Sequence, residues 1–216
     1  RHMTSVITEP HFAPTPHARA ELVREGIDPA QVVVTGNTVV DALQSILPRL
    51  PERRRTNAGR MVLVTAHRRE NLGAPLHSIC QALLLLLERF ADLRVIFPVH
   101  RNPAVRQVVF QRLAGHPRVE LREPCDYLEF LGLMREAHLI LSDSGGVQEE
   151  APALGKPVLV LRRNTERPEG VAAGVSVLVG TETETIVARA SELLHDEAAY
   201  RARSRPRSCS STSSRR

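Results

Sequence analysis

The segment LILSDSGGVQEEAPALGKPVLVL, residues 139–161, carries the clearest indication of fold in the chain. Two apolar runs flank a small polar turn, residues 142–146, which is followed by a stretch of helical length with two adjacent carboxylates, Glu149 and Glu150. Short apolar runs bounded by turn residues predict buried strands. The segment is therefore predicted to form a strand, a turn, a helix and a second strand.

The same alternation extends over most of the 216 residues. Near-continuous apolar strands separated by helices predict a parallel sheet that is covered on both faces. Because parallel crossover connections are right-handed, the expected fold class is α/β, a doubly wound, Rossmann-like domain. The predicted strands are residues 31–36, 61–66, 93–99, 118–121, 138–143, 156–161 and 175–180. The predicted helices are residues 16–25, 37–47, 75–90, 103–114, 126–136, 146–154 and 183–195.

The charged residues are distributed unevenly along the chain. Residues 201–216 contain six arginines and no acid, and without them the 29 basic side chains fall to 23 against 24 acidic ones. The formal charge of +5 therefore belongs to a low-complexity Arg/Ser tail, which we expect to be disordered. Because only 3% of the residues are aromatic, the composition also disfavours nucleic-acid binding. The expected organisation is a connection over residues 1–30, a Rossmann-like domain over 31–200 and the tail.

Cysteine usage and hydropathy exclude several classes of protein. Cys80, Cys125 and Cys209 lack the spacing of a zinc site or of a disulfide framework. The apolar run ALLLLLERF, residues 82–90, is too short to cross a bilayer, and nothing resembles a signal peptide. We therefore expect a cytoplasmic protein with no metal site and no membrane partner.

Polar residues gather where the predicted strands end. A doubly wound sheet binds its ligands at the carboxyl ends of its strands. Four of the five segments that follow predicted strands are unusually polar or charged, whereas an ordinary connection needs only turn-forming residues. The five segments are residues 36–38, 67–71, 100–102, 142–146 and 162–169. Their composition predicts a binding site on one edge of the sheet.

Ser144, Gly145 and Gly146 stand where a predicted strand passes into a helix. The free backbone N–H groups and the dipole of a helix N-terminus favour an anion such as phosphate. A carboxylate nearby would repel phosphate, but Glu150 could reach past it and accept two hydrogen bonds from the hydroxyls of a ribose. The pattern thus indicates a nucleotide site. The alternative is a serine N-cap followed by acids that interact with the helix dipole.

Basic residues on the same edge could complete such a site. Arg167 is followed by a proline that stiffens its loop and can present a forked donor to an anion, whereas Arg162 and Arg163 fit better as solvated loop charges. His67 ends a predicted strand, where a histidine can donate to phosphate or transfer a proton near neutral pH. His100 has a similar but weaker context. The edge therefore supplies many binding groups and few catalytic ones.

Six motifs along residues 1–200 resemble the C-terminal part of the non-hydrolysing UDP-N-acetylglucosamine 2-epimerases, and they occur in that family's order. They are RHMTSVITEPHFAPT, VTGNTVVDAL, VTAHRRENLG, DYLEFLGLM, SDSGGVQEEAPALGKPVLVLRRNTERPEGVAAG and VLVGT. The resemblance implies a glycosyltransferase-B-type architecture of two Rossmann-like domains. It implies interconversion of UDP-GlcNAc and UDP-ManNAc by elimination and re-addition of UDP, without metal or nicotinamide, in a homodimer that serves polysaccharide biosynthesis.

The resemblance also implies roles for individual residues. Ser144, Gly145 and Gly146 would hold the phosphates of UDP, with Arg167 nearby. Glu150 would bind the ribose hydroxyls, and Phe130 would lie beside the uracil. His67 would be the functional histidine of the HRREN motif. Arg68 and His100 match positions that help to bind a second, regulatory UDP-GlcNAc in bacterial members.

The chain departs from the family pattern at both ends. The N-terminal domain, which carries the acids credited with proton transfer at C2, is not in this sequence, and the Arg/Ser tail replaces the family's last helix. The chain could therefore be a catalytically inactive UDP-binding module. The donor-binding lobe of a UDP-sugar glycosyltransferase is a further alternative, although it would need neither the HRREN nor the ERPEG motif.

From these groups we predict that the isolated chain binds UDP but does not turn over UDP-GlcNAc. The phosphate-binding and ribose-binding residues are present, whereas the proton-transfer acids are not. Calorimetric titration with UDP and a coupled epimerase assay on the same preparation measure the two properties. Turnover by the 216-residue chain alone would contradict this prediction.

Overall fold

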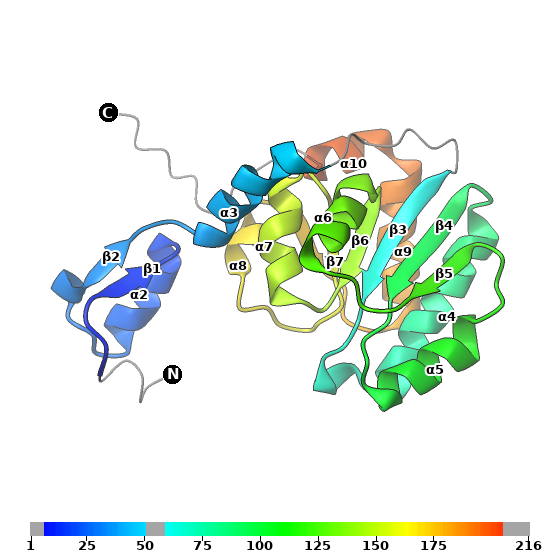
Figure 1. Cartoon of the computed structure of the whole chain (residues 1–216), viewed down its shortest axis with the longest axis horizontal. Coiled ribbons are helices and arrows are strands. Elements are labelled where there is room, and N and C mark those ends of the chain that lie inside the picture. The colour runs from blue at the N-terminus through cyan, green and yellow to red at the C-terminus, as the bar shows by residue number, and fades with distance from the viewer. Residues whose placement is uncertain (1–6, 51–58, 205–216) are drawn as a thin grey trace. The chain divides into compact units, whose positions relative to one another are not determined.

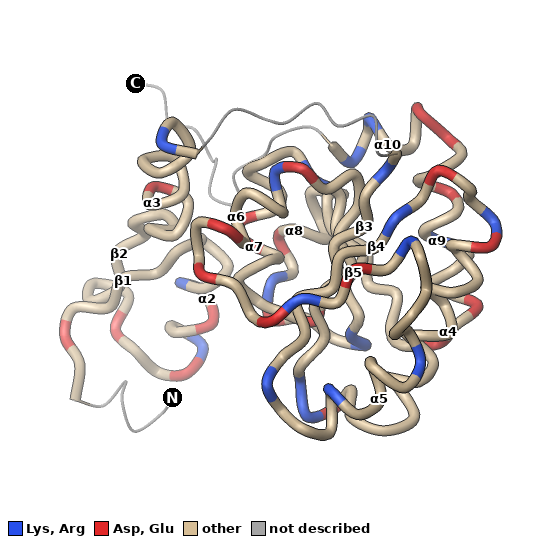
Figure 2. Tube along the Cα trace, turned by 45° about the vertical axis from the view of Figure 1, so that its right-hand side comes forward, with Lys and Arg blue, Asp and Glu red and all other residues tan. Residues whose placement is uncertain are grey.

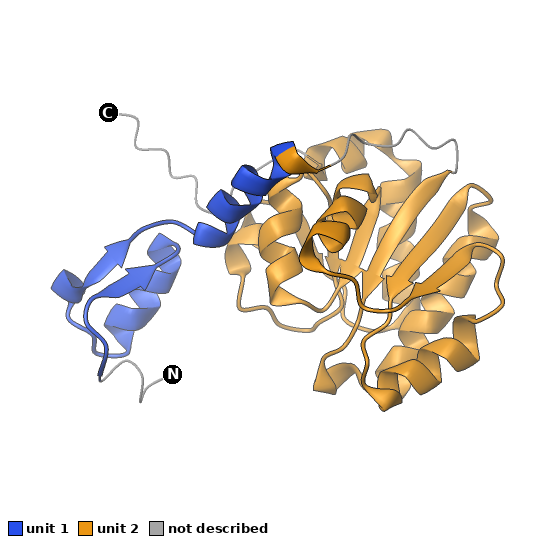
Figure 3. Ribbon diagram, viewed as in Figure 1, with its two compact units in different colours: residues 1–48, 208–216 blue, residues 49–207 orange. Residues whose placement is uncertain are grey.

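The computed structural model of the chain describes residues 7–50 and 59–204. These residues belong to two compact units that divide after Pro48 (Figure 3). Most of the predicted Arg/Ser tail lies outside the described residues. Its first residues, however, belong to the last helix, α10 (Glu197–Arg203), so the predicted boundary at residue 200 falls inside a helix.

The smaller unit contains a parallel β–α–β arrangement followed by a helix. Two residues cap its helices: the side chain of Thr15 accepts a hydrogen bond from Ala18 N, and that of Asn37 accepts one from Val39 N. Such caps satisfy N–H groups that have no partner within the helix. The elements are β1 (His11–Ala13), α2 (Pro16–Arg24), η1 (Pro29–Gln31), β2 (Val32–Val34) and α3 (Thr38–Ile46), with η2 (Leu47–Arg49) at the boundary.

The predicted strand at residues 31–36 does not join the large sheet. Its central part, β2, pairs in parallel with β1, and Phe12 lies opposite Val33 in that register. Phe12 is 66% exposed, and Val33 and Val34 are exposed as well. The predicted domain boundary after residue 30 therefore moves to Pro48. A short run of valines predicts a strand but does not show which strand it pairs with. For this reason the sequence pattern assigned residues 31–36 to the wrong sheet.

The larger unit is the predicted doubly wound α/β domain. Its six strands are all parallel and follow the order β5-β4-β3-β6-β7-β8 (Figure 1). The strands are β3 (Arg60–Thr65), β4 (Leu93–Pro98), β5 (Val119–Arg122), β6 (Leu139–Ser142), β7 (Val158–Val160) and β8 (Ser176–Leu178). The helices are α4 (Ala74–Arg89), α5 (Pro103–Leu113), α6 (Tyr127–Glu136), α7 (Gly145–Ala153), α8 (Pro168–Ala172), α9 (Thr183–His195) and α10, with η3 (Arg69–Asn71) before α4. No helix in the described ranges is long and apolar enough to span a membrane.

Helices cover both faces of this sheet. α4 contacts α5 and α9 on one face, and α6 and α7 lie on the other (Figure 1). Alternate residues of β3 serve the two faces, since Val62 and Val64 join the cluster beneath α4 and α9 whereas Leu63 points away from it. All three are fully buried, which explains the continuous apolar pattern of the strand in the sequence.

The entry to β3 depends on a glycine. Gly59 has a φ of 78°, and a Cβ there would lie 2.0 Å from the carbonyl oxygen of Asp92. The same carbonyl accepts a hydrogen bond from Arg60 N (2.9 Å), and the Arg60 guanidinium binds the Asp92 carboxylate through contacts of 2.6 and 2.7 Å. This close approach fixes the start of β3 against the residues that precede β4.

Two neighbouring strands bring their carboxyl ends together at the centre of the sheet. β3 and β6 pair directly, and their connections lead to α4 on one face and to α7 on the other. At their ends, the hydroxyls of Thr65 and Ser142 are hydrogen-bonded at 2.7 Å, and Asp143 N donates to Thr65 O at 3.2 Å. This point is the topological switch of the fold, where doubly wound proteins bind their ligands.

The structure contains two helices that the sequence pattern did not predict, α8 and α10. The sequence pattern assigned residues 162–169 to a polar segment after a strand and began the tail at residue 201, because both helices are short and the second is rich in arginine. Tyr200 nevertheless anchors α10, since its hydroxyl donates to His138 O at 2.9 Å. The Tyr200 and His138 rings also stack, with centroids 4.1 Å apart and planes 9° apart.

We predict that His138 makes the larger unit sensitive to acid. Burial, reinforced by Arg60 and Lys156, lowers the pKa of His138 to about 4 from the ordinary value of 6.5. Between these values the unfolded chain binds a proton that the folded chain does not, so the free energy of unfolding should fall as the pH falls through this window. Urea unfolding at about pH 7.5 and about pH 4.5 should show this loss, roughly 1–3 kcal/mol once partial solvent screening is allowed for.

Two variants isolate the contribution of His138. His138→Phe keeps a ring for Tyr200 to stack on but cannot be protonated, so it should lose less stability on acidification than the wild type. His17→Phe, at an exposed position on α2, should lose as much as the wild type. An equal acid-induced loss in His138→Phe and in the wild type would exclude His138 as the cause.

Candidate functional site

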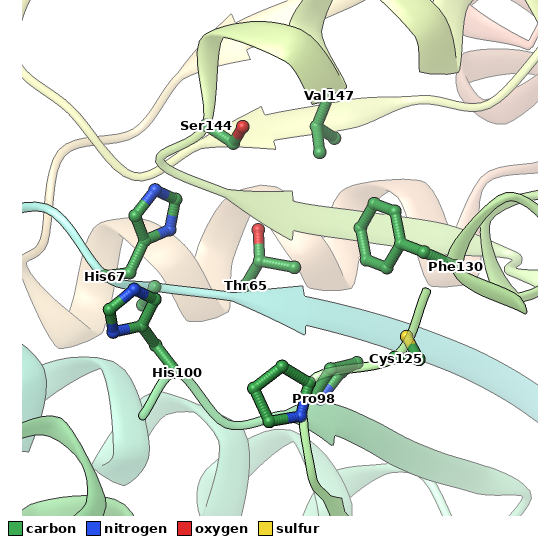
Figure 4. Close-up of a pocket in the computed structure, with 10 residues that line it drawn as sticks. Thr65, His67, Pro98, His100, Cys125, Phe130, Ser144 and Val147 are labelled. Atoms are coloured by element: carbon green, nitrogen blue, oxygen red, sulfur yellow. The ribbon is translucent and has the colours of Figure 1, made fainter. Parts of the chain in front are cut away.

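A pocket of about 190 Å³ opens at the carboxyl ends of β3, β4, β5 and β6. Figure 4 shows its side chains projecting from these strand ends and from the first turns of α6 and α7. The lining residues are Thr65, Ala66, His67, Pro98, His100, Pro124, Cys125, Phe130, Ser144 and Val147. The pocket therefore lies on the edge of the sheet that the sequence predicted, next to the switch point.

Two histidines lie together at this pocket. The rings of His67 and His100 stack with their centroids 5.5 Å apart and their planes 17° apart (Figure 4). His100 Nδ1 accepts a hydrogen bond from Asn102 N at 3.1 Å, which orients its ring. The two histidines follow β3 and β4, so the pairing of these strands brings them together.

Asp143, which the sequence reasoning did not select, holds the loop that carries His67. Its Oδ2 accepts hydrogen bonds of 2.9 Å from His67 N, Arg68 N and Asn71 Nδ2. Its Oδ1 lies 3.1 Å from His67 Nδ1. Arg68 Nε returns a hydrogen bond of 2.9 Å to Asp143 O. One buried carboxylate at the end of β6 thus organises the HRREN segment after β3.

The charges of Asp143 and His67 stabilise each other. The Asp143 carboxylate beside the ring raises the pKa of His67, although burial and the nearby Arg68 oppose this. Burial by itself would raise the pKa of Asp143. The contact with the His67 side chain and the hydrogen bonds from the backbone of Arg68 and His67 outweigh that effect, so the pKa of Asp143 is lowered. A histidine that holds its proton more tightly is suited to a pocket that receives an anion.

The N-terminus of α7 is flanked by two guanidinium groups. α7 begins at Gly145, and the side chain of Ser144 makes no capping hydrogen bond to it. A Cβ on Gly145 would lie 3.9 Å from Arg68 Nη2 and 4.0 Å from Arg167 Nη2. The absent side chain thus leaves room between two cations at a helix N-terminus, an arrangement suited to a phosphate group.

Both guanidinium groups lie beside carboxylates. Arg167 forms a hydrogen-bonded ion pair with Glu149, and Arg68 Nη2 lies 3.9 Å from Glu166. Glu166 also interacts with Arg162, which lowers its pKa. Figure 2 shows basic segments gathered along the lower edge of the larger unit, with acidic segments among them. Each cation of the site therefore has a carboxylate within ion-pair distance.

Glu150 lies beyond this pair, between α7 and α6. Its side chain interacts with that of Tyr127. Burial and the neighbouring Glu149 raise the pKa of Glu150, and the interaction with Tyr127 opposes the rise. Tyr127 is the first residue of α6, the helix that also supplies Phe130 to the pocket. The Glu150 side chain therefore lies near the start of α6.

The structure brings the predicted site residues to one edge of the sheet. His67, His100, Phe130 and Ser144 line the pocket, whereas Arg68 and Arg167 adjoin Gly145. Gly146 follows in the first turn of α7, and Glu150 lies one turn further along that helix. The roles that the sequence analysis gave to these residues stay predictions, but their proximity is a property of the fold.

One expectation about this edge is wrong, and several contributing residues were missed. Arg162 is not a solvated loop charge, because it is buried and lies 2.8 Å from Glu70. Arg163 is exposed, as expected. Asp143 belongs to the turn at residues 142–146. The one feature that could have singled it out is that it is an acid in a segment otherwise suited to binding an anion. Cys125 and Val147 gave no signal, since they contribute only surface to the pocket.

The fold and the site together define the class of protein. A doubly wound parallel sheet with an arginine-flanked helix N-terminus at its switch point is a Rossmann-like domain suited to an anionic ligand. The family model described as UDP-N-acetylglucosamine 2-epimerase matches residues 1–212. The chain belongs to this family, as the motifs predicted.

Individual relatives agree with this assignment. The UDP-N-acetylglucosamine 2-epimerase of Bacillus subtilis is 45% identical over 204 residues, which cover 93% of this chain and 54% of the relative. The crystal structure of the Neisseria meningitidis UDP-GlcNAc 2-epimerase bound to UDP-GlcNAc is 41% identical, with a TM-score of 0.90 over 97% of this chain and 60% of that one. A UDP co-structure of S. aureus MnaA is also 41% identical, with a TM-score of 0.91 over 97% of this chain and 58% of that one. The chain thus spans little more than half the length of these relatives.

We predict that Gly145→Ala blocks the anion site without unfolding the chain. The added methyl group would meet Arg68 and Arg167 at ordinary contact distances of 3.9 and 4.0 Å, and Gly145 does not have a positive φ. Stability should stay level or rise by at most about 1 kcal/mol, because alanine favours helix more than glycine does. The methyl group would occupy the space between the guanidinium groups, so the affinity for inorganic diphosphate, measured by calorimetry, should fall by about tenfold or more.

Gly132→Ala is the matched control for this substitution. Gly132 lies within α6, and a Cβ there would meet nothing within 4 Å. This variant should be at least as stable as the wild type and should bind diphosphate equally well. Normal diphosphate binding by a folded Gly145→Ala protein would show that the anion does not lie between Arg68 and Arg167.

Proposed function

We propose that this chain is the UDP-binding part of a non-hydrolysing UDP-N-acetylglucosamine 2-epimerase, an isomerase that interconverts UDP-GlcNAc and UDP-ManNAc. The observation that carries the proposal is the convergence of Arg68 and Arg167 on Gly145 at the N-terminus of α7. Family membership supports a uridine nucleotide as the anion, because the N. meningitidis and S. aureus relatives are bound to UDP-GlcNAc and UDP.

The proposed site takes UDP in three parts. The diphosphate lies at Ser144, Gly145 and Gly146, where backbone N–H groups, Arg167 and the helix dipole supply positive charge. The ribose hydroxyls donate to Glu150, which would exchange its interaction with Tyr127 for two bonds to the diol. The uracil lies beside Phe130, in the apolar part of the pocket.

The proposed reaction places its largest change of charge on the diphosphate. UDP leaves C1 of the sugar as the proton at C2 is removed, and it then adds back as a proton returns on the other face. The helix N-terminus, Arg167 and Arg68 stabilise the charge that develops on the departing phosphate. His67, whose proton is held by Asp143, supplies a hydrogen bond or a proton to the same anion.

Other parts of the proposal rest on the resemblance alone. The acids that transfer the C2 proton are expected in an N-terminal domain of a glycosyltransferase-B-type architecture, outside this chain. A homodimer, a cytoplasmic setting and a second, regulatory UDP-GlcNAc at Arg68 and His100 are expected for the whole protein. Because Arg68 and His100 adjoin the proposed UDP site, a regulatory nucleotide would lie next to the substrate.

We predict that Glu150→Ala weakens the binding of UDP far more than that of inorganic diphosphate. Loss of two hydrogen bonds from the ribose to a carboxylate should weaken UDP by about 10- to 100-fold, whereas diphosphate makes no such contact. Calorimetric titration of both ligands measures the difference. The control is Glu136→Gln at the far end of α6, which should bind both ligands normally.

The two ligands also separate the alternatives. If UDP and diphosphate weaken equally in Glu150→Ala, Glu150 does not bind the ribose. If the wild type binds diphosphate but not UDP, the chain has an anion site without a nucleotide site, and the proposed function fails. If the wild type binds UDP but a longer protein that contains both this chain and an N-terminal domain shows no epimerase activity, the chain is a UDP-binding module.

A further inference from the structure

The two carboxylate oxygens of Asp143 have different surroundings. Oδ2 accepts the three hydrogen bonds that fix the loop, from His67 N, Arg68 N and Asn71 Nδ2. Oδ1 is buried and, within the described residues, makes no hydrogen bond of good geometry, and the His67 ring lies 3.1 Å from it. Fixing the loop therefore engages Oδ2 alone, and Oδ1 is left to interact with the imidazole.

The pair joins a buried group to an accessible one. The Asp143 side chain is 0% exposed, whereas that of His67 is 38% exposed and lines the pocket. A carboxylate beside Nδ1 favours the tautomer that carries its proton on that nitrogen. The other ring nitrogen, Nε2, is then free to accept a hydrogen bond when His67 is neutral and to donate one when it is protonated.

We propose that Asp143 is a positioning residue that holds His67 in the Nδ1–H tautomer and leaves Nε2 to interact with the ligand. The identity of that ligand, the diphosphate of UDP, rests on the proposed function. The buried Asp143 carboxylate does not reach the anion itself. By fixing the tautomer of His67, it would determine which ring nitrogen contacts the anion. The charged and titratable groups around the ring are Asp143, Arg68 and the stacked His100.

A purely structural role for Asp143 makes a different prediction from a positioning role. Asn71→Ala removes one hydrogen bond to Oδ2 and one of 3.1 Å to Leu161 O, but it leaves Oδ1 and the His67 ring in place. Asp143→Asn keeps an oxygen that can accept the backbone N–H bonds and removes the charge beside Nδ1. The first variant perturbs the loop, and the second perturbs the histidine.

The test is NMR spectroscopy of the histidine side chains in the full chain, by long-range 1H–15N correlation across a pH titration, with His67→Gln to assign the signals. In the wild type we expect neutral His67 to be the Nδ1–H tautomer. In Asp143→Asn we expect its pKa to fall by about 1 or more and the Nε2–H tautomer to become populated. In Asn71→Ala we expect the wild-type tautomer and a pKa within about 0.3 of the wild-type value.

Either of two results would overturn the proposal: a wild-type His67 in the Nε2–H tautomer, or an Asp143→Asn protein whose His67 titrates as in the wild type. If Asp143→Asn does not fold, the tautomer of His67 in the wild type tests the proposal by itself: Nδ1–H supports it and Nε2–H overturns it. Titration of the same samples with UDP tests the proposed function separately. An Nδ1–H tautomer without UDP binding would refute only the choice of nucleotide, whereas UDP binding with an Nε2–H tautomer would refute only the role of Asp143.

Discussion

The pairing of β3 with β6 is the constraint on which the candidate site depends. These two strands lie side by side in the middle of the sheet, although 73 residues separate the end of β3 from the start of β6. Their carboxyl ends bring the HRREN segment next to the turn that opens α7. Asp143 then joins the two segments through its carboxylate. Without this pairing, the histidine and the helix N-terminus would belong to separate parts of the surface.

Much of the larger unit could be predicted from the sequence, because its strands are buried on both faces and therefore appear as continuous apolar runs. The segments 61–66 and 138–143 correspond to β3 and β6 within a residue or two. The strand order within the sheet was not predicted, since each apolar run is compatible with several partners. β2 illustrates the same limit, because it pairs with β1 in the smaller unit and not with a strand of the large sheet.

The site was predictable to the extent that its residues follow strands. Ser144, Gly145 and Arg167 could be selected because backbone donors and a loop arginine give local signals of anion binding. Asp143 could not, because its importance comes from a partner 76 positions away in the chain, His67. The exposure of Arg162 was predicted wrongly for a related reason. The sequence does not distinguish Arg162 from its neighbour Arg163, and only the structure shows that Arg162 is buried beside Glu70.

The carboxylates beside Arg68 and Arg167 have a consequence for the conditions under which a ligand binds. Glu149 and Glu166 already neutralise part of the positive charge of Arg167 and Arg68 at the α7 N-terminus. A phosphate that binds there therefore replaces these carboxylates as the counter-ion of the two arginines. Dissolved salt screens the internal pair and the new contact in a similar way. The affinity for a nucleotide should therefore depend less steeply on ionic strength than at a site whose arginines have no acidic neighbours.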